Sequence, residues 1–335
     1  MAIKLSICIP TYNRAEYLSE TLESIVCQLT DEVEIVISDN ASVDNTSDIV
    51  RRFMKATPNI IYVQQKENLG ADRNYMKSIE LASGVYCWLF GSDDVMSLGA
   101  IQNILSEING GLDLYLCGFT ECTIDMRPLK DHKMTTVSYG STFDLSLENE
   151  RKIYFEKALT SSAFFSFLGS IIVKKVKWNQ SNGGEEFIGS LWSHVGKVLG
   201  IIPFGLKIKF IGSSFLFKRG GNDSFVDKGL VNRYRIAIDG YGDLGATFFG
   251  PHSVEAFHMR RVVRNELSLR TLSSAKYKCE VCSDQENLLV LNRIVNKHYA
   301  DKTLMNFISL LGYRLLTKRI YGAMKFAKKF AGGYA

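Results

Sequence analysis

Two adjacent carboxylates, Asp93 and Asp94, directly follow an apolar run of strand-forming residues at 85–89. A buried strand of a parallel sheet carries the residues that follow it to the edge of the sheet. Hard divalent cations bind oxygen ligands, usually one or two carboxylates together with the phosphates of a substrate. The pair therefore predicts a site for a Mg²⁺ or Mn²⁺ ion and a diphosphate. The alternative is structural, because an Asp-Asp pair can also cap a helix, such as one over residues 96–108.

The elements that must position this pair alternate in type along the first eighty residues. Apolar, strand-like runs are separated by amphipathic, helix-like stretches, at residues 5–10, 17–29, 33–38, 49–54, 60–63 and 75–82. Such βαβα order implies a parallel sheet with helices on both of its faces. The sequence therefore predicts the α/β class.

Polar loops follow the predicted strands, at residues 10–14, 39–42, 68–74 and 92–94. Each loop alone has a structural interpretation as a strand end, a helix cap or a turn. In an open α/β sheet, however, ligands bind beyond the carboxyl ends of the strands. Four such loops in succession therefore indicate one shared site that binds a nucleotide.

The motifs in these loops resemble those of the family 2 glycosyltransferases, which have the GT-A fold. The resemblance is strong over about residues 3–120 and weaker to about residue 225. Within the family, the nearer likeness is to the bacterial O-antigen and lipopolysaccharide branch that includes abequosyltransferases, which attach a 3,6-dideoxyhexose. The motifs that carry the resemblance are residues 6–14, 36–40, 68–70 and 92–94.

This resemblance implies a GT-A nucleotide-diphospho-sugar transferase fold, with a mostly parallel central sheet flanked by helices and a helical C-terminal extension. It also implies a glycosyltransferase of the hexosyltransferase class. The enzyme would move a sugar, such as a dideoxyhexose, from a nucleoside-diphosphate sugar of the UDP or CDP type. The acceptor would be a polyprenyl-linked oligosaccharide in the biosynthesis of O-antigen or another surface polysaccharide.

The resemblance further implies which side chains bind the nucleotide sugar. Asp39 would hydrogen-bond the pyrimidine ring, since a carboxylate accepts from a ring N–H or an amino group. Arg73 would approach the donor as a cation able to bind phosphate, with a solvated helix arginine as the structural alternative. The other residues implied in donor binding are Pro10, Thr11, Tyr12, Arg14, Asn68, Gly70, Asp93 and Arg219, the last in a loop at 218–224 that the family folds over the donor.

Asp93 and Asp94 match the metal-binding motif of the family, which is written Asp-x-Asp. The match implies that Asp94 is the direct ligand of the cation and that Asp93 lies nearer the sugar. Ser92 stands where the first aspartate of the motif would stand, which is a departure from the family pattern. A bound Mg²⁺ or Mn²⁺ ion would stabilise charge on the leaving phosphate oxygen by several kcal/mol.

The acceptor hydroxyl must lose a proton, and a positioned Glu, Asp or His accelerates such a step by typically ~10²–10⁴-fold. Family members commonly carry an acidic pair a few residues before Leu-Trp, and Glu185 and Glu186 precede Leu191 and Trp192 here at a longer spacing. The candidate bases are therefore Glu186, then Glu185, then His194. The structural alternatives are a solvated loop for the glutamates and a hydrogen-bonded helix histidine. Because the base is not identified, the sequence does not decide whether the transfer inverts or retains the configuration at the anomeric carbon of the sugar.

The composition predicts an intracellular globular protein. A chain of 335 residues with 46% hydrophobic content can form the core of one large domain and an appendage. Its seven scattered cysteines show no disulfide framework and indicate a reducing compartment. Residues 1–4 lead straight into a predicted strand, so no signal peptide is expected and the protein is predicted to be cytoplasmic. The longest uncharged run, at 158–173, is too short and too polar to span a membrane and is predicted to be a buried strand.

The charges are distributed unevenly. Residues 1–120 carry 8 basic and 16 acidic residues, whereas the whole chain has a net charge of +5. Residues 302–335 include seven basic and no acidic residues, interleaved with apolar ones. This pattern predicts a basic amphipathic helix on the inner face of the cell membrane, with a helix packed on its own domain as the alternative. The basic face would consist of Arg314, Lys318, Lys325, Lys328 and Lys329.

We expect a GT-A domain over residues 1–225 and a helical region over 226–335. The first would contain a nucleotide-sugar half at 1–120 and an acceptor half at 121–225. Gly220, Gly221 and Asn222 form a turn signal near the boundary. No recognition motif for nucleic acid is present, and the predicted ligand half is acidic, so nucleic acid is not an expected partner.

Two other classes of function stay open at this point. A sugar nucleotidyltransferase would share the nucleotide, the metal and the sheet, but it would carry a glycine-rich phosphate loop after the first strand. Residues 10–14 contain no glycine. The second alternative is a non-catalytic nucleotide-sugar-binding protein of the same fold, which donor hydrolysis by the purified protein would exclude.

Overall fold

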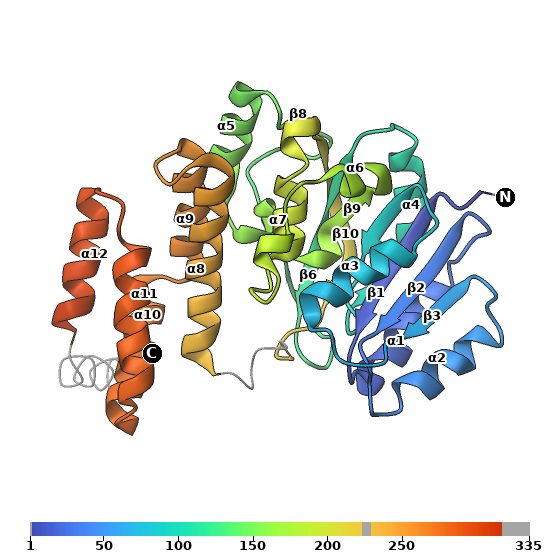
Figure 1. Cartoon of the computed structure of the whole chain (residues 1–335), viewed down its shortest axis with the longest axis horizontal. Coiled ribbons are helices and arrows are strands. Elements are labelled where there is room, and N and C mark those ends of the chain that lie inside the picture. Colours follow the sequence, from blue (N-terminus) through green and yellow to red (C-terminus); the bar gives the residue numbers. More distant parts are fainter. Residues whose placement is uncertain (1, 223–228, 317–335) are drawn as a thin grey trace, which may run out of the picture. The chain divides into compact units, whose positions relative to one another are not determined.

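The computed structural model describes residues 2–222 and 229–316 of the chain. The chain divides into two compact units, Met1–Asn222 and Asp223–Ala335. The described part of the first unit is built around a sheet, and that of the second consists of helices (Figure 1). The division falls a few residues before the expected boundary at 225.

One mixed sheet forms the centre of the first unit, with the strand order β3-β2-β1-β4-β9-β6-β10-β5. The pairs β1–β2, β2–β3, β1–β4 and β6–β10 are parallel, whereas β9 runs antiparallel between β4 and β6. The predicted α/β class is therefore confirmed. The strands are Leu5–Thr11 (β1), Val33–Asp39 (β2), Ile60–Gln64 (β3), Tyr86–Leu89 (β4), Val95–Met96 (β5), Leu114–Cys122 (β6), Pro128–Asp131 (β7, beside β6), Thr142–Asp144 (β8, beside β10), Ile171–Lys174 (β9) and Lys207–Lys218 (β10).

The central strands are buried on both faces, as expected for parallel strands covered by helices. Every residue of β2 is buried, including the charged Glu34. The Glu34 carboxylate accepts hydrogen bonds from Ser6 Oγ at 2.6 Å and from Ser83 Oγ at 2.8 Å. A buried carboxylate is tolerated where such donors satisfy it.

Helices flank this sheet and begin where the local sequence favours them. The helix α3 follows Gly70, whose φ of 83° is readily adopted only by glycine, and it packs on β1 and β2. Its position brings the polar loop at 68–74 to the carboxyl edge of the sheet. The helices of this unit are Ala15–Val26 (α1), Thr46–Met54 (α2), Ala71–Leu81 (α3), Ala100–Ile108 (α4), Glu148–Lys157 (α5), Lys175–Gln180 (α6) and Ser193–Leu199 (α7), with short 3-10 helices at Ser161–Phe164 (η1), Leu168–Ser170 (η2), Glu185–Phe187 (η3) and Ile202–Phe204 (η4).

The prediction of a strand over residues 158–173 is wrong for most of that run. The helices η1 and η2 occupy its middle, and β9 begins only at Ile171. Small hydroxyl residues and Gly169 interrupt the run, and such residues favour turns because their side chains bond the nearby backbone. Ser170 Oγ, for example, donates to Phe167 O at 2.7 Å.

The second unit contains Leu230–Phe249 (α8), Val254–Glu266 (α9), Gln285–His298 (α11) and the helices Leu269–Cys282 (α10) and Leu304–Leu315 (α12). Four of these helices begin directly after a residue whose side chain accepts a backbone N–H of the first turn, as at a standard N-cap. The capping residues are Ser253, Ser268, Asp284 and Thr303.

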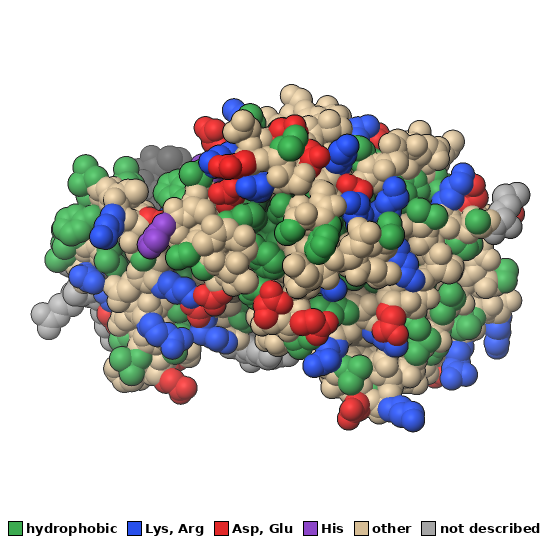
Figure 2. Space-filling view, turned by 45° about the horizontal axis from the view of Figure 1, so that its top comes forward, with side chains coloured by type: hydrophobic (Ala, Val, Ile, Leu, Met, Phe, Trp, Pro, Cys, Tyr) green, Lys and Arg blue, Asp and Glu red, His purple; other side chains and the backbone are tan. Residues whose placement is uncertain are grey.

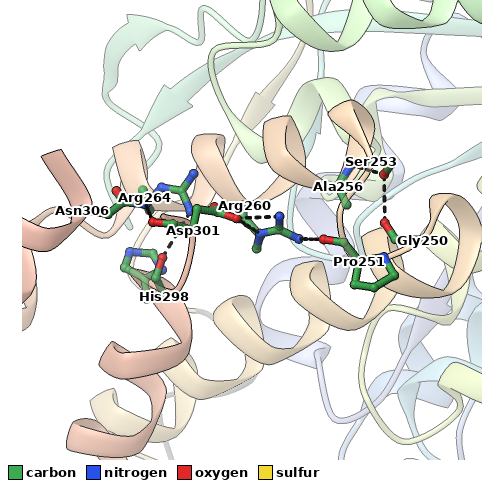
Figure 3. A network of polar contacts seen from close by, with 9 residues as sticks. All are labelled: Gly250, Pro251, Ser253, Ala256, Arg260, Arg264, His298, Asp301 and Asn306. Carbon is green, nitrogen blue, oxygen red and sulfur yellow. Dashed lines mark hydrogen bonds and ion pairs between the residues drawn. The ribbon is translucent and has the colours of Figure 1, made fainter. Parts of the chain in front are cut away.

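An ion-pair network links α9 to the turn between α11 and α12 (Figure 3). Asp301 Oδ1 lies 2.7 Å from Arg260 Nη2, and its Oδ2 lies 2.7 Å from Arg264 Nη1. Asn306 Nδ2 donates to the backbone carbonyl of Asp301 at 3.1 Å. One aspartate therefore holds two arginines of α9 and also stabilises the start of α12.

The helix α12 exposes apolar side chains to solvent. Figure 2 shows hydrophobic side chains gathered at the end of the view where α12 lies. The exposed residues are Leu304, Met305, Phe307, Ile308, Leu311 and Leu315. In the predicted basic face, Lys318, Lys325, Lys328 and Lys329 lie outside the described residues. Within residues 2–222 and 229–316, no helix has the length and apolarity needed to cross a bilayer.

Candidate active site

Asp93 and Asp94 lie in the short connection between β4 and β5, at the carboxyl edge of the sheet. Asp94 is buried, with 4% of its surface exposed. Its Oδ1 accepts the backbone N–H of Arg219 at 3.0 Å, and its backbone carbonyl accepts Thr21 Oγ1 at 2.8 Å. The predicted metal ligand is thus held from α1 on one side and from the end of β10 on the other.

Asp93 is held by residues that lie far away in the sequence. Its Oδ2 accepts Asn222 Nδ2 at 2.6 Å, and Arg14 Nη2 lies 4.0 Å from the same oxygen. Arg14 Nη2 also donates to the backbone carbonyl of Asn222 at 3.2 Å. The structure therefore brings Arg14, predicted to bind the donor, to the carboxylate pair.

One carboxylate oxygen of Asp93 and one of Asp94 converge over Gly91. A Cβ atom at Gly91 would lie 2.5 Å from Asp94 Oδ2 and 3.1 Å from Asp93 Oδ1. The absence of that side chain leaves a cradle bounded by two carboxylate oxygens. Carboxylate oxygens are the donor type that Mg²⁺ and other hard divalent cations take, so the residues present fit such an ion in their chemistry.

The electrostatics of the pair also favour a cation. Burial and then the charge of Asp93 raise the pKa of Asp94 to about 8. Burial likewise raises the pKa of Asp93, against the opposing charge of Arg14. Among the described residues, no group of three or more His, Cys, Asp or Glu side chains is placed so that the group could hold a metal ion by itself. A cation at this pair would therefore take its remaining ligands from a substrate, as is usual for Mg²⁺ bound with phosphates.

Arg219, predicted to bind the donor, uses its side chain to hold the loop that ends the first unit. Its Nε donates to Asp93 O at 2.8 Å, and its Nη1 donates to Ile124 O at 2.6 Å. Its Nη2 pairs with Glu20, and its guanidinium lies 4.8 Å from the centre of the Tyr17 ring. In this structure the guanidinium binds protein groups and fixes the backbone N–H that reaches Asp94.

The last residue of β1 has a buried polar atom for which the described residues provide no partner. Thr11 is 2% exposed, and its Oγ1 makes no hydrogen bond within the described residues. A buried hydroxyl without a partner is costly and is usually satisfied by water or by a ligand. Pro10 is half-buried and Tyr12 is 44% exposed.

Asp39, predicted to bind the pyrimidine ring, is fully buried at the end of β2. Its Oδ1 accepts the backbone N–H of Ser42 at 2.9 Å, and its Oδ2 accepts Tyr62 Oη at 2.7 Å. Each carboxylate oxygen can accept more than one hydrogen bond. Tyr62 of β3 and Ser42 of the loop after β2 therefore orient the carboxylate, which can still accept further hydrogen bonds.

Asn68 and Gly70 shape the turn before α3. Asn68 Oδ1 accepts Asn40 Nδ2 at 2.8 Å and the backbone N–H of Gly70 at 2.9 Å. Asn40 Oδ1 in turn accepts the backbone N–H of Leu69 at 2.8 Å. These two asparagines join the ends of β2 and β3, whereas Arg73 is exposed on α3.

The three candidate bases lie in different environments. Glu185 and Glu186 are exposed in η3, whereas His194 is 3% exposed in α7. Burial lowers the pKa of His194 to about 4, so its ring is neutral near pH 7. Its ring packs edge-on against Tyr75, with the ring centres 5.8 Å apart. The structure therefore distinguishes one buried, neutral histidine from two exposed glutamates.

Tyr75, Asp72 and Asn222 belong to the site, although the sequence did not single them out. Burial, followed by the charges of Asp72 and Asp93, raises the pKa of Tyr75. Asp72 accepts hydrogen bonds from the segment that precedes His194. All three residues stand in polar loops or the first turns after them, and their partners lie too far along the chain for a local pattern to reveal.

Comparisons with known proteins identify the family of the chain. Residues 6–171 match the model of the family described as "Glycosyl transferase family 2". The chain is 35% identical over 251 residues to abequosyltransferase RfbV of Salmonella typhimurium, covering 73% of this chain and 75% of that protein. It is 27% identical to the Campylobacter jejuni GalNAc(5)-diNAcBac-PP-undecaprenol beta-1,3-glucosyltransferase, covering 72% of each chain.

Solved structures show the same fold at lower sequence identity. Staphylococcus aureus TarS 1-349, solved in complex with UDP-GlcNAc, aligns with a TM-score of 0.63 and 16% identity, over 96% of this chain and 92% of that chain. The mannosyltransferase PcManGT from Pyrobaculum calidifontis, solved with GDP-Man and Mn²⁺, aligns with a TM-score of 0.53 and 14% identity, over 97% and 84%. From the family match and the Salmonella relative, the chain belongs to glycosyl transferase family 2 and is a glycosyltransferase with the GT-A fold.

Proposed function

We propose that the protein transfers a sugar from a nucleoside-diphosphate sugar to a polyprenyl-linked oligosaccharide during synthesis of O-antigen or a similar surface polysaccharide. The observation that carries the proposal is the cradle over Gly91, where one carboxylate oxygen of Asp93 and one of Asp94 converge. The Salmonella relative is named for transfer of abequose, and the Campylobacter relative for an undecaprenol-linked acceptor. These names support a dideoxyhexose as the sugar and a lipid-linked acceptor.

The donor diphosphate would lie beyond the carboxyl ends of β1, β2 and β4. Asp94 and Asp93 would hold a Mg²⁺ or Mn²⁺ ion, which when bound stabilises negative charge on the leaving phosphate. Arg14 adds a positive charge beside Asp93, in reach of the same phosphates. Thr11 offers its buried hydroxyl and Asp39 its remaining lone pairs to the nucleoside, which we expect to be of the UDP or CDP type.

The test is thermal unfolding of the purified protein with UDP, CDP and GDP, each with and without Mn²⁺ or Mg²⁺. A ligand that binds the native state at 100 times its Kd stabilises it by about 2.7 kcal/mol. We expect a metal-dependent rise in Tm with UDP or CDP. The variant Asp94→Asn should lose it, because a neutral amide is a poor ligand for a hard cation.

The control is Asp31→Asn, which changes an exposed carboxylate. It should keep the full rise in Tm. Asp94→Asn keeps an oxygen that can accept the N–H of Arg219, so the variant should stay folded and its loss of response would be specific. A wild-type protein that responds to none of the three nucleotides, with or without metal, would contradict the proposal.

We also propose that α12 contacts the membrane surface that carries the acceptor. Helix α12 exposes apolar side chains, and residues 302–335 contain seven basic and no acidic residues. A segment with both properties binds anionic lipid through apolar burial and charge.

Sedimentation with vesicles tests this surface. Phe307 and Leu289 are 65% and 71% exposed, on α12 and α11 respectively. We expect binding to vesicles that contain phosphatidylglycerol, with loss in Phe307→Asp and retention in Leu289→Asp. Equal binding by both variants would show that α12 is not the contact.

A further inference from the structure

A pocket in the helical unit lies between the start of α8 and one face of α10. Its volume is about 290 Å³, and we call it the α8–α10 pocket. Side chains of α10 that stand four residues apart share one face of the helix and form one of its walls. The walls include Leu230 and Tyr234 of α8 and Arg270, Thr271, Ser274 and Lys278 of α10.

The α8–α10 pocket has two cations that the protein does not neutralise. Arg270 and Lys278 are exposed, and neither forms an ion pair or a hydrogen bond with another described residue. Within residues 229–316, no acidic side chain lines the pocket. Other cations of this unit are paired, as Lys297 is with Asp239 at 3.0 Å and with Asp243 at 2.9 Å. The pocket therefore presents two positive charges that are available to a ligand.

The pocket also has hydroxyl groups without partners. Tyr234 is only 8% exposed and lines the pocket, yet its hydroxyl makes no hydrogen bond within the described part of the chain. Burial raises the pKa of Tyr234, so this hydroxyl keeps its proton and can donate it to a ligand. The half-buried Ser274 likewise has no partner among the described residues. A buried polar group without a protein partner is usually satisfied by water or by a ligand.

This set of donors fits phosphate groups. Arginine binds phosphate oxygens through two parallel N–H groups, and lysine binds them as a compact charge. Arg270 stands in the first turn of α10, which has no acidic residue and where the helix dipole favours an anion. Lys278 stands eight residues later, about 12 Å along the helix axis, with Ser274 midway. Two long cationic side chains at this spacing match the two phosphates of a diphosphate.

The helix that forms the basic wall of the pocket also carries α12, which exposes apolar side chains. Lys276 Nζ of α10 donates to the backbone carbonyl of Tyr313 at 2.9 Å. Leu269, which directly precedes Arg270, packs on Gly312, where an added Cβ would lie 3.4 Å from Leu269 Cδ2. The pocket and the proposed membrane contact are therefore attached to the same helix, which favours a phosphate that belongs to a lipid.

We propose that the α8–α10 pocket binds the diphosphate of the polyprenyl-linked acceptor. Arg270 and Lys278 bind the phosphate oxygens, and Tyr234 and Ser274 donate their hydroxyl groups to them. The helical unit then holds the acceptor lipid, whereas residues of the first unit hold the donor. This inference rests on the proposed function, which supplies the lipid-linked acceptor.

The test is isothermal titration calorimetry of the full-length protein with geranyl diphosphate, a soluble prenyl diphosphate, and with inorganic phosphate. EDTA removes divalent cations, so the proposed metal-dependent donor site does not bind the probe. We expect the wild type to bind geranyl diphosphate at least ten-fold more tightly than inorganic phosphate. Arg270→Ala and Lys278→Ala should each raise the Kd for geranyl diphosphate at least ten-fold, because charge-assisted hydrogen bonds to phosphate are strong.

The matched control is Arg293→Ala, which removes an exposed cation of α11 that has no partner in the described part of the chain. It changes the net charge by the same amount and should bind geranyl diphosphate as the wild type does. Tyr234→Phe removes only the buried hydroxyl of the pocket and should weaken binding by a few-fold. Arg270 and Lys278 are exposed, so their variants should stay folded.

Three results would overturn the inference. The first is a wild type that does not bind geranyl diphosphate, or that binds it no more tightly than phosphate. The second is an equal loss in Arg293→Ala, which would indicate general charge attraction. The third is sedimentation with phosphatidylglycerol vesicles that depends on Arg270 and Lys278 without any binding of geranyl diphosphate, since the ligand would then be a phospholipid headgroup. Failure of the proposed function has a separate sign, a Tm that does not respond to any nucleotide with metal.

Discussion

Gly91 matters because of the side chain it lacks. The two carboxylate oxygens that would bind a cation lie 2.5 Å and 3.1 Å from the position of its missing Cβ. We expect Gly91→Ala to fill this cradle and to displace Asp94 Oδ2, so that the Mn²⁺-dependent part of the nucleotide response in Tm disappears. The measurement is the Tm of wild type and variant in thermal unfolding with UDP or CDP, each with and without Mn²⁺.

The neighbouring substitution Ser92→Ala is the control for Gly91→Ala. Ser92 is buried, at 8% exposed, and its substitution by alanine removes a hydroxyl without adding any atom between the carboxylates. It should keep the metal-dependent response. A full response in Gly91→Ala would mean that the ion binds elsewhere.

Single residues could be predicted from the sequence where their chemistry is local. Asp93 and Asp94 stand side by side after an apolar run, so their types and spacing suggest a metal site, which stays a prediction here. Asp72 and Asn222 could not be found in this way. Asp72 binds the N–H of Gly189, 117 residues further along the chain, and no local pattern specifies that contact.

Among the elements, the connection between α11 and α12 depends on Asp301. Its carboxylate binds Arg260 and Arg264, and all three side chains are less than a fifth exposed. We expect Asp301→Ala to destabilise the helical unit by about 3 kcal/mol, because breaking a largely buried pair leaves charges without a partner. All three tryptophans lie in the first unit. Urea unfolding followed by far-UV circular dichroism, with tryptophan fluorescence as the reporter of the first unit, measures the loss.

An exposed ion pair of the same unit provides the control for Asp301→Ala. Asp243 pairs with Lys297 at 2.9 Å but is 60% exposed. Exposed pairs contribute about 0–1 kcal/mol, so Asp243→Ala should have little effect. Equal losses in the two variants would show that burial does not set the strength of the Asp301 network.

The elements were predictable to different degrees. The alternation of the first eighty residues predicted β1 to β3 and α1 to α3, because each strand there is a mainly apolar run. The antiparallel strand β9 was not predicted as a four-residue strand. The apolar residues of β9 form the end of the uncharged run at 158–173. Only the pairing with β4 and β6 decides which residues of that run are extended.

At the scale of the whole molecule, two buried histidines make stability depend on pH. Burial lowers the pKa of His194 in the first unit and of His298 in the second, each to about 4. The unfolded chain binds these protons near the ordinary pKa of about 6.5. The contribution of each histidine is therefore complete above pH 6.5 and falls as the pH drops toward 4, by up to about 3 kcal/mol per histidine. Unfolding in urea at pH 7.5 and pH 5 should show this loss directly in the second unit, whereas in the first unit the protonation of Asp94, whose pKa is raised to about 8, acts in the opposite direction.

Substitution of each histidine separates the two contributions. His194→Phe should reduce the loss between pH 7.5 and pH 5 reported by tryptophan fluorescence. His298→Gln, which can still donate to Leu267 O, should reduce the loss reported by circular dichroism. A pH dependence that neither variant changes would place the titrating groups elsewhere.

The interleaved strand order also determines when the site can form during synthesis. Strand β4 stays without its neighbour β9 until residue 174 has been made, and Asp94 lacks the N–H of Arg219, which lies 125 residues later. At a synthesis rate of about 5–20 residues per second, this delay is about 6–25 s. For the part of that time before β9 is complete, 85 residues after the end of β4 or about 4–17 s, the growing chain exposes the edge of a largely apolar strand, which can pair with other chains. We therefore expect that protection of this edge, by the ribosome or by chaperones, improves the yield of folded enzyme.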